Sequence, residues 1–250
     1  MSGKIYEKEH QIKYYECDTM QKMTISMLIN IMIHVSGEQS YLLGVGDEVV
    51  AEKGLAWIIL QYEVEVERMP AFYESIKITT QANSYNKLFC YRAFKVYDSQ
   101  GNLCVNVNST FALMNVQERK MARVPAELIA PYESEFSKKL IRMPKPVKVD
   151  EEKMTSKEYQ VRYLDIDSNC HVNNSKYIEW AMDTLDLEFL TTHEIETMTI
   201  KFEKEVHYGQ LIHSEISSAK NQENGIVTAH RILTEGVTNC EASIVWKVTA

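Results

Sequence analysis

The sequence predicts an α+β protein of two repeated domains, each an antiparallel sheet wrapped around a long central helix. Three observations lead to this prediction. The 250-residue chain is about twice the commonest domain size. A proline-containing, charged segment divides it past its middle, and each part reads as a short strand, a helix and then a run of strands.

The dividing segment, residues 141–156, has the sequence IRMPKPVKVDEEKMTS. Proline has no N–H for a sheet ladder and disfavours helix at the preceding residue, so neither a helix nor a central strand is expected there. We therefore expect an N-terminal domain at residues 1–140, a linker at 141–156 and a C-terminal domain at 157–250.

Each predicted domain contains one main helix. The first runs from about Thr24, a suitable N-cap, to Leu43, and it is apolar nearly all round, which predicts burial nearly all round. The second runs from about Asn174 to Leu187, with apolar residues at helical spacing and charged residues opposite.

Strands rich in Ile, Val, Tyr and Thr follow each helix. Their expected ranges are Leu55–Arg68, Ser75–Tyr85, Phe89–Asp98 and Leu103–Asn115, then Thr197–Val206, Ile212–Asn221, Ile226–Thr234 and Glu241–Thr249. A weak internal similarity pairs residues 62–66 with 202–206 and Asp18 with Asp165. A long apolar helix followed by antiparallel strands packs economically when the sheet curls around it, which is the hot-dog architecture, here in tandem.

Composition excludes several classes of protein. The chain has 27 Lys and Arg against 35 Asp and Glu, a net charge of −8, which argues against a general nucleic-acid binder. No run approaches the roughly 18 apolar residues of a membrane helix. The first residues lack signal-peptide and transit-peptide character, so we expect no membrane insertion and a cytoplasmic location. The five cysteines show no CxxC spacing, which favours reduced thiols over disulfides or zinc.

The segment Val161–Trp180, VRYLDIDSNCHVNNSKYIEW, gathers Asp, Asn and His directly before the second helix. A helix N-terminus presents unpaired N–H groups and a partial positive charge, which can polarise a carbonyl and stabilise an oxyanion. The chain has no G-x-S-x-G sequence, so a serine-hydrolase mechanism is not expected.

The stretch DIDSNCHVNNSKYIEW resembles the D-x-D-x-N-x-H-V-N-N-x-K-Y-I-x-W signature of the acyl-acyl carrier protein thioesterases, tandem hot-dog enzymes of plants and bacteria. The resemblance implies that Asp167, Asn169 and His171 are catalytic and that Glu205, on a following strand, completes the set. The family often has Cys directly after that Glu. Here the position is Val206, which excludes a cysteine nucleophile there. The shorter D-x-D-x-x-x-H-V-N-N pattern is shared by the wider hot-dog superfamily.

The expected reaction is thioester hydrolysis without a cofactor. Asn169 and His171 would position water or substrate, and either Glu205 or Asp167 would be the general base. Asp167 as a simple turn or capping residue is the competing interpretation. Glu203, Glu205 and His207 would share one strand face, but that spacing is too wide for one ion, so no metal is expected.

The first domain is expected to be catalytically silent, because its turn ECDTMQKMT keeps Asp18 without a following Asn or His. The resemblance implies that this domain sets acyl chain length. Candidate substrate-binding residues are Met23, Met27, Trp57 and Asn174. Ordinary core packing for the methionines and helix capping for Asn174 are the alternatives.

The implied substrate is an acyl carrier protein bearing an acyl-phosphopantetheine. Five basic residues could form its docking patch, or could simply be a solvated linker: Lys138, Lys139, Arg142, Lys145 and Lys148. The competing functions are a hot-dog acyl-CoA thioesterase, a double hot-dog hydro-lyase and a non-catalytic acyl-binding module. Monomer and homodimer both remain open.

Overall fold

The computed structural model describes residues 3–220 and 225–249. Its contacts divide the chain into two compact units, which are treated separately below. One unit runs to Thr24 and from Leu28 to Met143, and the other comprises Ile25–Met27 and the chain from Pro144 onward. The domain ranges expected from the sequence stay a prediction.

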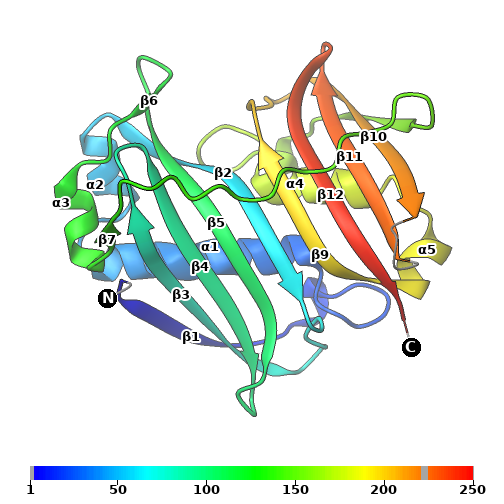
Figure 1. The fold of residues 1–250 in the computed structure, drawn as a ribbon, viewed down its shortest axis with the longest axis horizontal. Coiled ribbons are helices and arrows are strands. Elements are labelled where there is room, and N and C mark those ends of the chain that lie inside the picture. The colour runs from blue at the N-terminus through cyan, green and yellow to red at the C-terminus, as the bar shows by residue number, and fades with distance from the viewer. Residues whose placement is uncertain (1–2, 221–224, 250) are drawn as a thin grey trace. The chain divides into compact units, whose positions relative to one another are not determined.

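The first unit is an antiparallel sheet against which a long helix lies (Figure 1). The strand order is β1-β3-β4-β5-β2. The bounds are β1 Ile5–Gln11, β2 Leu55–Val66, β3 Ser75–Tyr85, β4 Phe89–Asp98 and β5 Leu103–Asn115, with short strands β6 Lys120–Ala122 and β7 Glu135–Phe136. Three of the four predicted strands have the expected bounds, and β2 ends two residues early.

The helix α1, Ile25–Leu42, is the long helix expected from the sequence. Thr24 precedes it, and the Thr24 carbonyl accepts from the Leu28 N–H at 3.0 Å. Buried apolar side chains such as Leu28, Met32 and Val35 recur along it. Two of these are completely inaccessible to solvent, so the helix supplies the centre of the core, as its apolar sequence predicts.

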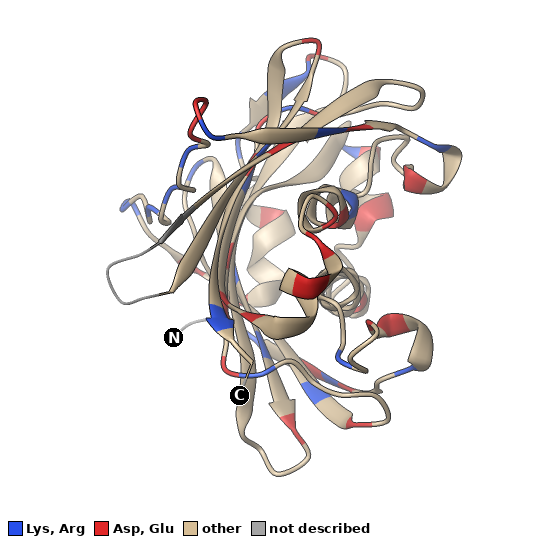
Figure 2. Ribbon diagram, turned by 90° about the vertical axis from the view of Figure 1, so that its right-hand side faces the viewer, with Lys and Arg blue, Asp and Glu red and all other residues tan. Residues whose placement is uncertain are grey.

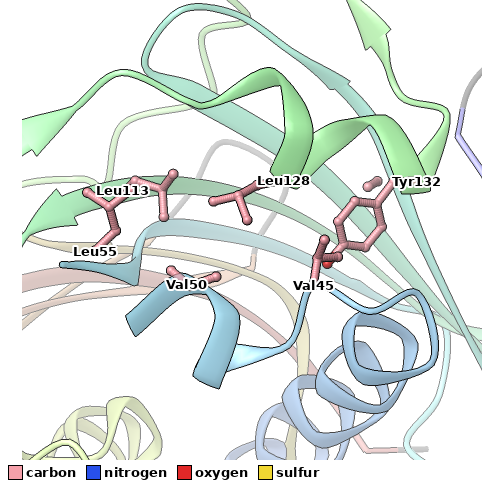
Figure 3. Close-up of a cluster of buried hydrophobic side chains, with 7 residues drawn as sticks. Val45, Val50, Leu55, Leu113, Leu128 and Tyr132 are labelled. Atoms are coloured by element: carbon pink, nitrogen blue, oxygen red, sulfur yellow. The ribbon is translucent and has the colours of Figure 1, made fainter. Parts of the chain in front are cut away.

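One end of the first unit is closed by two short helices, α2 at Asp47–Glu52 and α3 at Ala126–Ile129. Their apolar side chains form a single buried cluster with residues of the sheet (Figure 3). Its members are Val45, Val50, Leu55, Ala82, Leu113, Leu128 and Tyr132. The Tyr132 hydroxyl donates to Ser40 Oγ at 2.6 Å, which fixes this end to α1.

The second unit repeats the plan, with strand order β9-β12-β11-β10-β8, again antiparallel. The bounds are β8 Thr155–Gln160, β9 His193–Phe202, β10 Leu211–Lys220, β11 Ile226–Thr234 and β12 Val237–Val248. The predicted end of β10 at Asn221 lies outside the described residues. Its central helix, α4, runs from Asn174 to Met182 and packs against β10 and β11. Both units are therefore hot-dog domains, in tandem.

The second helix is shorter than the predicted Asn174–Leu187 range. The Thr184 hydroxyl donates to the Ala181 carbonyl at 2.6 Å, and such a bond competes with the helical backbone ladder. Asp186 then caps a separate helix, α5 at Leu187–Thr192, by accepting from the Phe189 N–H at 2.7 Å.

The internal repeat is visible in the backbone hydrogen bonds around the two turns. Asp18 N–H donates to Lys22 O at 2.9 Å, and Asp167 N–H donates to His171 O at 2.9 Å. The counterpart of Asp167 is therefore Asp18, and the sequence pairing of Asp18 with Asp165 is wrong.

The loops after β2 and β9 repeat in the same way. The Cys104 carbonyl accepts from the N–H groups of residues 67 and 68, and the Asn239 carbonyl accepts from those of residues 203 and 204. Residues 67 and 68 therefore correspond to 203 and 204, and the next residue in each loop makes Met69 the counterpart of Glu205. The sequence pairing of 62–66 with 202–206 is thus displaced by several residues.

Acidic and basic residues are distributed over strands, helices and loops (Figure 2). Among the residues that the structure describes, no helix combines the length and the hydropathy required to cross a bilayer.

Candidate functional site

The polar segment before α4 begins at a buried carboxylate paired with an exposed arginine. Asp165 is 1 % exposed and accepts from the Arg162 backbone N–H at 2.8 Å and from its guanidinium at 3.0 Å. Burial opposes ionisation of Asp165, but the Arg162 hydrogen bonds outweigh it and hold the pKa of Asp165 below its usual value. Asp165 therefore anchors the segment and takes no direct part in the site.

Asp167 closes the next turn. Its Oδ1 accepts from the backbone N–H groups of Asn169 at 2.8 Å and His171 at 3.4 Å. Cys170 completes the turn in the left-handed region, with φ 64°. This geometry leaves the Asn169 side chain exposed and the His171 ring partly exposed.

The start of α4 is capped by Asn173, whose side-chain oxygen accepts from the Ser175 N–H at 2.9 Å. Asn174 is the first helical residue and does not act as the cap. Across residues 3–220 and 225–249, no acceptor bonds the Asn174 backbone N–H. One donor at the positive end of the helix is therefore available to a ligand.

Glu205 does not lie on a strand, contrary to the expectation from the sequence. β9 ends at Phe202, and the Asn239 side-chain amide donates to the carbonyls of Lys204 and Glu205, each at 3.4 Å. The ladder stops where the Asn239 backbone carbonyl accepts from both the Glu203 and the Lys204 N–H groups, and the side-chain amide adds long contacts to the loop that follows. The alternating residues 203, 205 and 207 consequently do not form one strand face.

This departure from the sheet brings Glu205 to the turn before α4. Glu205 Oε2 lies 3.2 Å from His171 Nε2, and the two side chains are 26 % and 29 % exposed. Two further bonds fix the contact: Val172 N–H donates to Val206 O at 3.1 Å, and Val206 N–H donates to the Tyr177 hydroxyl at 3.1 Å. The structure thus joins His171 and Glu205, which are far apart in the sequence.

Tyr177 supports the site from α4. Burial raises the pKa of Tyr177, and the nearby charges of Glu205 and Asp167 act in the same direction. The phenol therefore stays neutral at physiological pH and serves as a fixed acceptor for the Val206 N–H.

A second histidine, His207, lies beside the pair. Its ring centroid is 5.3 Å from that of His171, at an interplanar angle of 55°. From the sequence, His207 is a candidate only for a metal site, which the spacing disfavours. Its position two residues after Glu205 was the available signal for a place in the site.

The predicted substrate-binding residues are not gathered around this pair. Met23 is buried in the first unit, and Trp57 packs edge-on against Phe111 at 6.4 Å between ring centroids. Met27 is partly buried and clusters with the second unit. Their role in binding an acyl chain stays a prediction.

One cluster of the described residues has the spacing of metal ligands, and it lies elsewhere: Glu74, Asp98 and Cys104. The Arg68 guanidinium binds both carboxylates, at 2.5 Å and 3.1 Å. That cation already compensates their charge, so the cluster is a structural ion-pair network.

The five basic residues proposed for docking all have exposed side chains. In the part of the chain that the structure describes, none of them forms an ion pair with Asp or Glu.

Comparison with known proteins identifies the family. The acyl-ACP thioesterase N-terminal domain matches residues 3–132, and the acyl-ACP thioesterase C-terminal domain matches residues 148–248. A solved structure from Lactobacillus plantarum, provisionally assigned as an oleoyl thioesterase, is 33 % identical with a TM-score of 0.97, and the match covers 99 % of this chain and 98 % of that chain.

Two more distant relatives match over most of the chain. An acyl-ACP thioesterase from Bacteroides thetaiotaomicron has a TM-score of 0.83 at 23 % identity, covering 97 % of this chain and 98 % of that chain. The palmitoyl-acyl carrier protein thioesterase of Gossypium hirsutum chloroplasts is 26 % identical over 242 residues, which are 90 % of this chain and 58 % of that protein. The chain thus spans less than two thirds of this curated plant relative.

Proposed function

The chain belongs to the acyl-ACP thioesterase family, and we propose that it hydrolyses the thioester of an acyl-acyl carrier protein to a free fatty acid and the holo-carrier protein. The observation that carries the proposal is the contact between Glu205 and His171 beside the N-terminus of α4. Thioester hydrolysis requires a base for water and donors for the carbonyl oxygen. The contact supports the first requirement, and the helix terminus supports the second.

Glu205 is the general base in this proposal, and His171 holds its carboxylate. The internal repeat supports the choice between the two acidic candidates. Asp18 forms the same turn in the first unit as Asp167 does in the second, accepting from Met20 N–H at 2.8 Å and Lys22 N–H at 3.0 Å. Because the same carboxylate occurs in the turn of the silent unit, the hydrogen bonds of the turn are sufficient to explain Asp167. It is therefore the weaker candidate for the general base.

The remaining polar residues of the site are replaced in the first unit by residues of different chemistry. Asn169 corresponds to Met20, His171 to Lys22 and Glu205 to Met69. We therefore assign the reaction to Asn169, His171 and Glu205. Asp167 shapes the turn, and its charge also acts on the site. This division supports a silent first unit.

The Asn174 backbone N–H and the Asn169 side-chain amide are the proposed donors to the thioester oxygen. As water adds to the carbonyl carbon, Glu205 takes one proton, and the oxygen gains negative charge that these donors stabilise. The C–S bond then breaks, the electron pair leaves on sulfur, and the sulfur takes up a proton to give the thiol.

The carrier protein is the proposed substrate, with acyl-CoA as the alternative that presents the same thioester. Exposed Lys138, Lys139 and Arg142, and separately Lys145 and Lys148, are proposed to attract an acidic carrier protein. Charge reversal of either group should raise KM for acyl-carrier protein and leave KM for acyl-CoA unchanged. An equal change with both substrates would reject docking.

The experiment that tests the function measures thiol release from a chain-length series of acyl-carrier proteins and the matching acyl-CoA esters. The proposal expects release of holo-carrier protein, a higher kcat/KM for the carrier-protein series, and loss of both activities in Glu205→Gln. A hydro-lyase would consume enoyl thioesters without releasing thiol. Substitution of Met23, Met27 or Trp57 by Ala should shift the preferred chain length if these residues line the acyl pocket.

A further inference from the structure

The peptide group that joins Glu205 to Val206 is contacted at both of its polar atoms by side chains from other elements. The Val206 N–H donates to the Tyr177 hydroxyl at 3.1 Å, and the Glu205 carbonyl accepts a longer contact from the Asn239 amide at 3.4 Å. Tyr177 comes from α4 and Asn239 from β12, and both residues are buried. The backbone that carries the proposed base is therefore held from two sides.

Another bond of Val206, the one to the turn before α4, recurs in the first unit. The Val206 carbonyl accepts from the Val172 N–H at 3.1 Å. In the first unit, the Pro70 carbonyl accepts from the Met23 N–H at 2.8 Å. Pro70 is therefore the counterpart of Val206, which agrees with the pairing of the preceding residues in the two loops. A bond that is present in both units belongs to their shared scaffold.

The bond between Val206 and Tyr177 has no equivalent in the first unit. Pro70 has no N–H to donate. Leu28 is the fourth residue of α1, as Tyr177 is of α4, and its side chain has no polar atom to accept a hydrogen bond. The donor and the acceptor are thus both missing from the first unit. The bond is not required to build a hot-dog unit, and it accompanies the polar residues of the site.

We propose that Tyr177 is a positioning residue for the general base, an inference that rests on the proposed function and deepens it. Its hydroxyl fixes the peptide group next to Glu205, whose carboxylate lies 3.2 Å from His171 Nε2. Displacement of a reacting group by about 1 Å can cost about 10²-fold in rate. A hydrogen bond to the adjacent peptide group can therefore control turnover without touching the substrate.

The variant Tyr177→Phe removes the acceptor and keeps the packing of the ring. The Tyr177 ring contacts Trp180 and Phe202 edge-on, at 5.7 Å and 5.5 Å between centroids, and phenylalanine can keep both contacts. In the part of the chain that the structure describes, the Val206 N–H has no other acceptor. Loss of the hydroxyl therefore releases one side of the peptide group and lets Glu205 move relative to His171.

The test measures kcat and KM of Tyr177→Phe for acyl-carrier protein, together with its melting temperature. We expect kcat to fall at least about tenfold with KM unchanged, because the base is displaced and the binding of substrate is not. Val206→Pro removes the donor of the same bond, and Pro70 shows that the corresponding loop accommodates proline. The double variant should lose no more kcat than either single variant, because each removes the same interaction.

Two controls separate positioning from stability. Ile178→Val shortens the buried side chain next to Tyr177 on α4, so it should lower the melting temperature and leave kcat unchanged well below that temperature. Tyr159→Phe removes another tyrosine hydroxyl of the second unit, which donates to Asp183 Oδ2 at 2.6 Å, and it should also leave kcat unchanged. A role in stability alone would not separate Tyr177→Phe from Ile178→Val.

A smaller loss of kcat in Tyr177→Phe, an equal loss in Ile178→Val, or independent losses that multiply in the double variant would overturn the positioning role and leave the proposed function intact. If Val206→Pro does not fold, Tyr177→Phe and its two controls decide the question. Absence of thiol release by the wild-type chain would overturn the proposed function and this inference with it.

Discussion

Replacing Glu205 by Gln removes one charge and keeps the shape of the side chain. The amide oxygen can still face His171, so the 3.2 Å contact can persist. What is lost is the capacity to accept a proton from water. The substitution therefore separates the chemistry of the contact from its structural role.

The two effects differ greatly in size. A general base contributes about 10²–10⁴ in rate, or about 3–5 kcal/mol in the barrier at 1.36 kcal/mol per tenfold. The contact itself is partly exposed on both sides, and even a fully charged exposed pair contributes at most about 1 kcal/mol to folding. For a chain of this size that is a shift of about 2–4 °C in melting temperature.

The assay is thiol release under saturating acyl-carrier protein, with melting followed on the same preparations. Glu203→Gln is the matched control, because Glu203 lies on the same loop and pairs with the exposed Lys201. We expect kcat to fall at least about 100-fold in Glu205→Gln and to stay near wild type in Glu203→Gln. A Glu205→Gln variant that retains a tenth or more of wild-type kcat would refute Glu205 as the base.

Three further predictions concern the turn before α4. Asp167→Asn should keep the turn, because an amide oxygen can accept from the same N–H groups, but it should lower kcat about tenfold because a charge near the site is lost. The control Asp18→Asn should change stability as much as Asp167→Asn does and leave kcat unchanged. Cys170→Gly removes the strain of a left-handed backbone at a non-glycine residue, so the free energy of unfolding measured with denaturant should rise by about 0.5–1 kcal/mol. We expect kcat to stay unchanged because the thiol takes no part in the reaction. A drop in kcat would instead indicate a role for the sulfur. Asp165→Asn should cost about 1–3 kcal/mol at pH 7. Since the pKa of Asp165 is lowered in the folded state, its stabilisation exists above the unfolded-state pKa and is lost as pH falls, so melting curves of the two proteins should converge below about pH 4.

The fold could be predicted because its signals are local. An almost wholly apolar helix and strands bounded by turns gave the tandem plan, and three strands of the first unit have their predicted limits. The end of the second helix could not be predicted from apolar spacing, because Leu185 continues the helical pattern. The Thr184 hydroxyl and the Asp186 cap decide that end.

The site could be predicted only in part for a similar reason. The turn from Asp167 to His171 is contiguous in the sequence, and its residue types indicate its chemistry. Glu205 follows an alternating pattern typical of a strand, yet it lies beyond the end of the sheet, where the backbone carbonyl of Asn239, from another strand, accepts from both Glu203 and Lys204 N–H groups. Contacts of this kind depend on tertiary structure, and the ring contact of His207 with His171 is a further example.

The repeated turn has a consequence for engineering. The first unit retains the buried acidic anchor Glu16, the turn-forming Asp18 and the left-handed residue Gln21, so its backbone is already shaped to display a reactive set. Met20→Asn, Lys22→His and Met69→Glu would place that set on a scaffold made by the same chain. The silent unit can thus serve as the scaffold for a second site. Comparing the rates of the engineered and native sites would measure how much of the rate depends on the three side chains and how much on their surroundings.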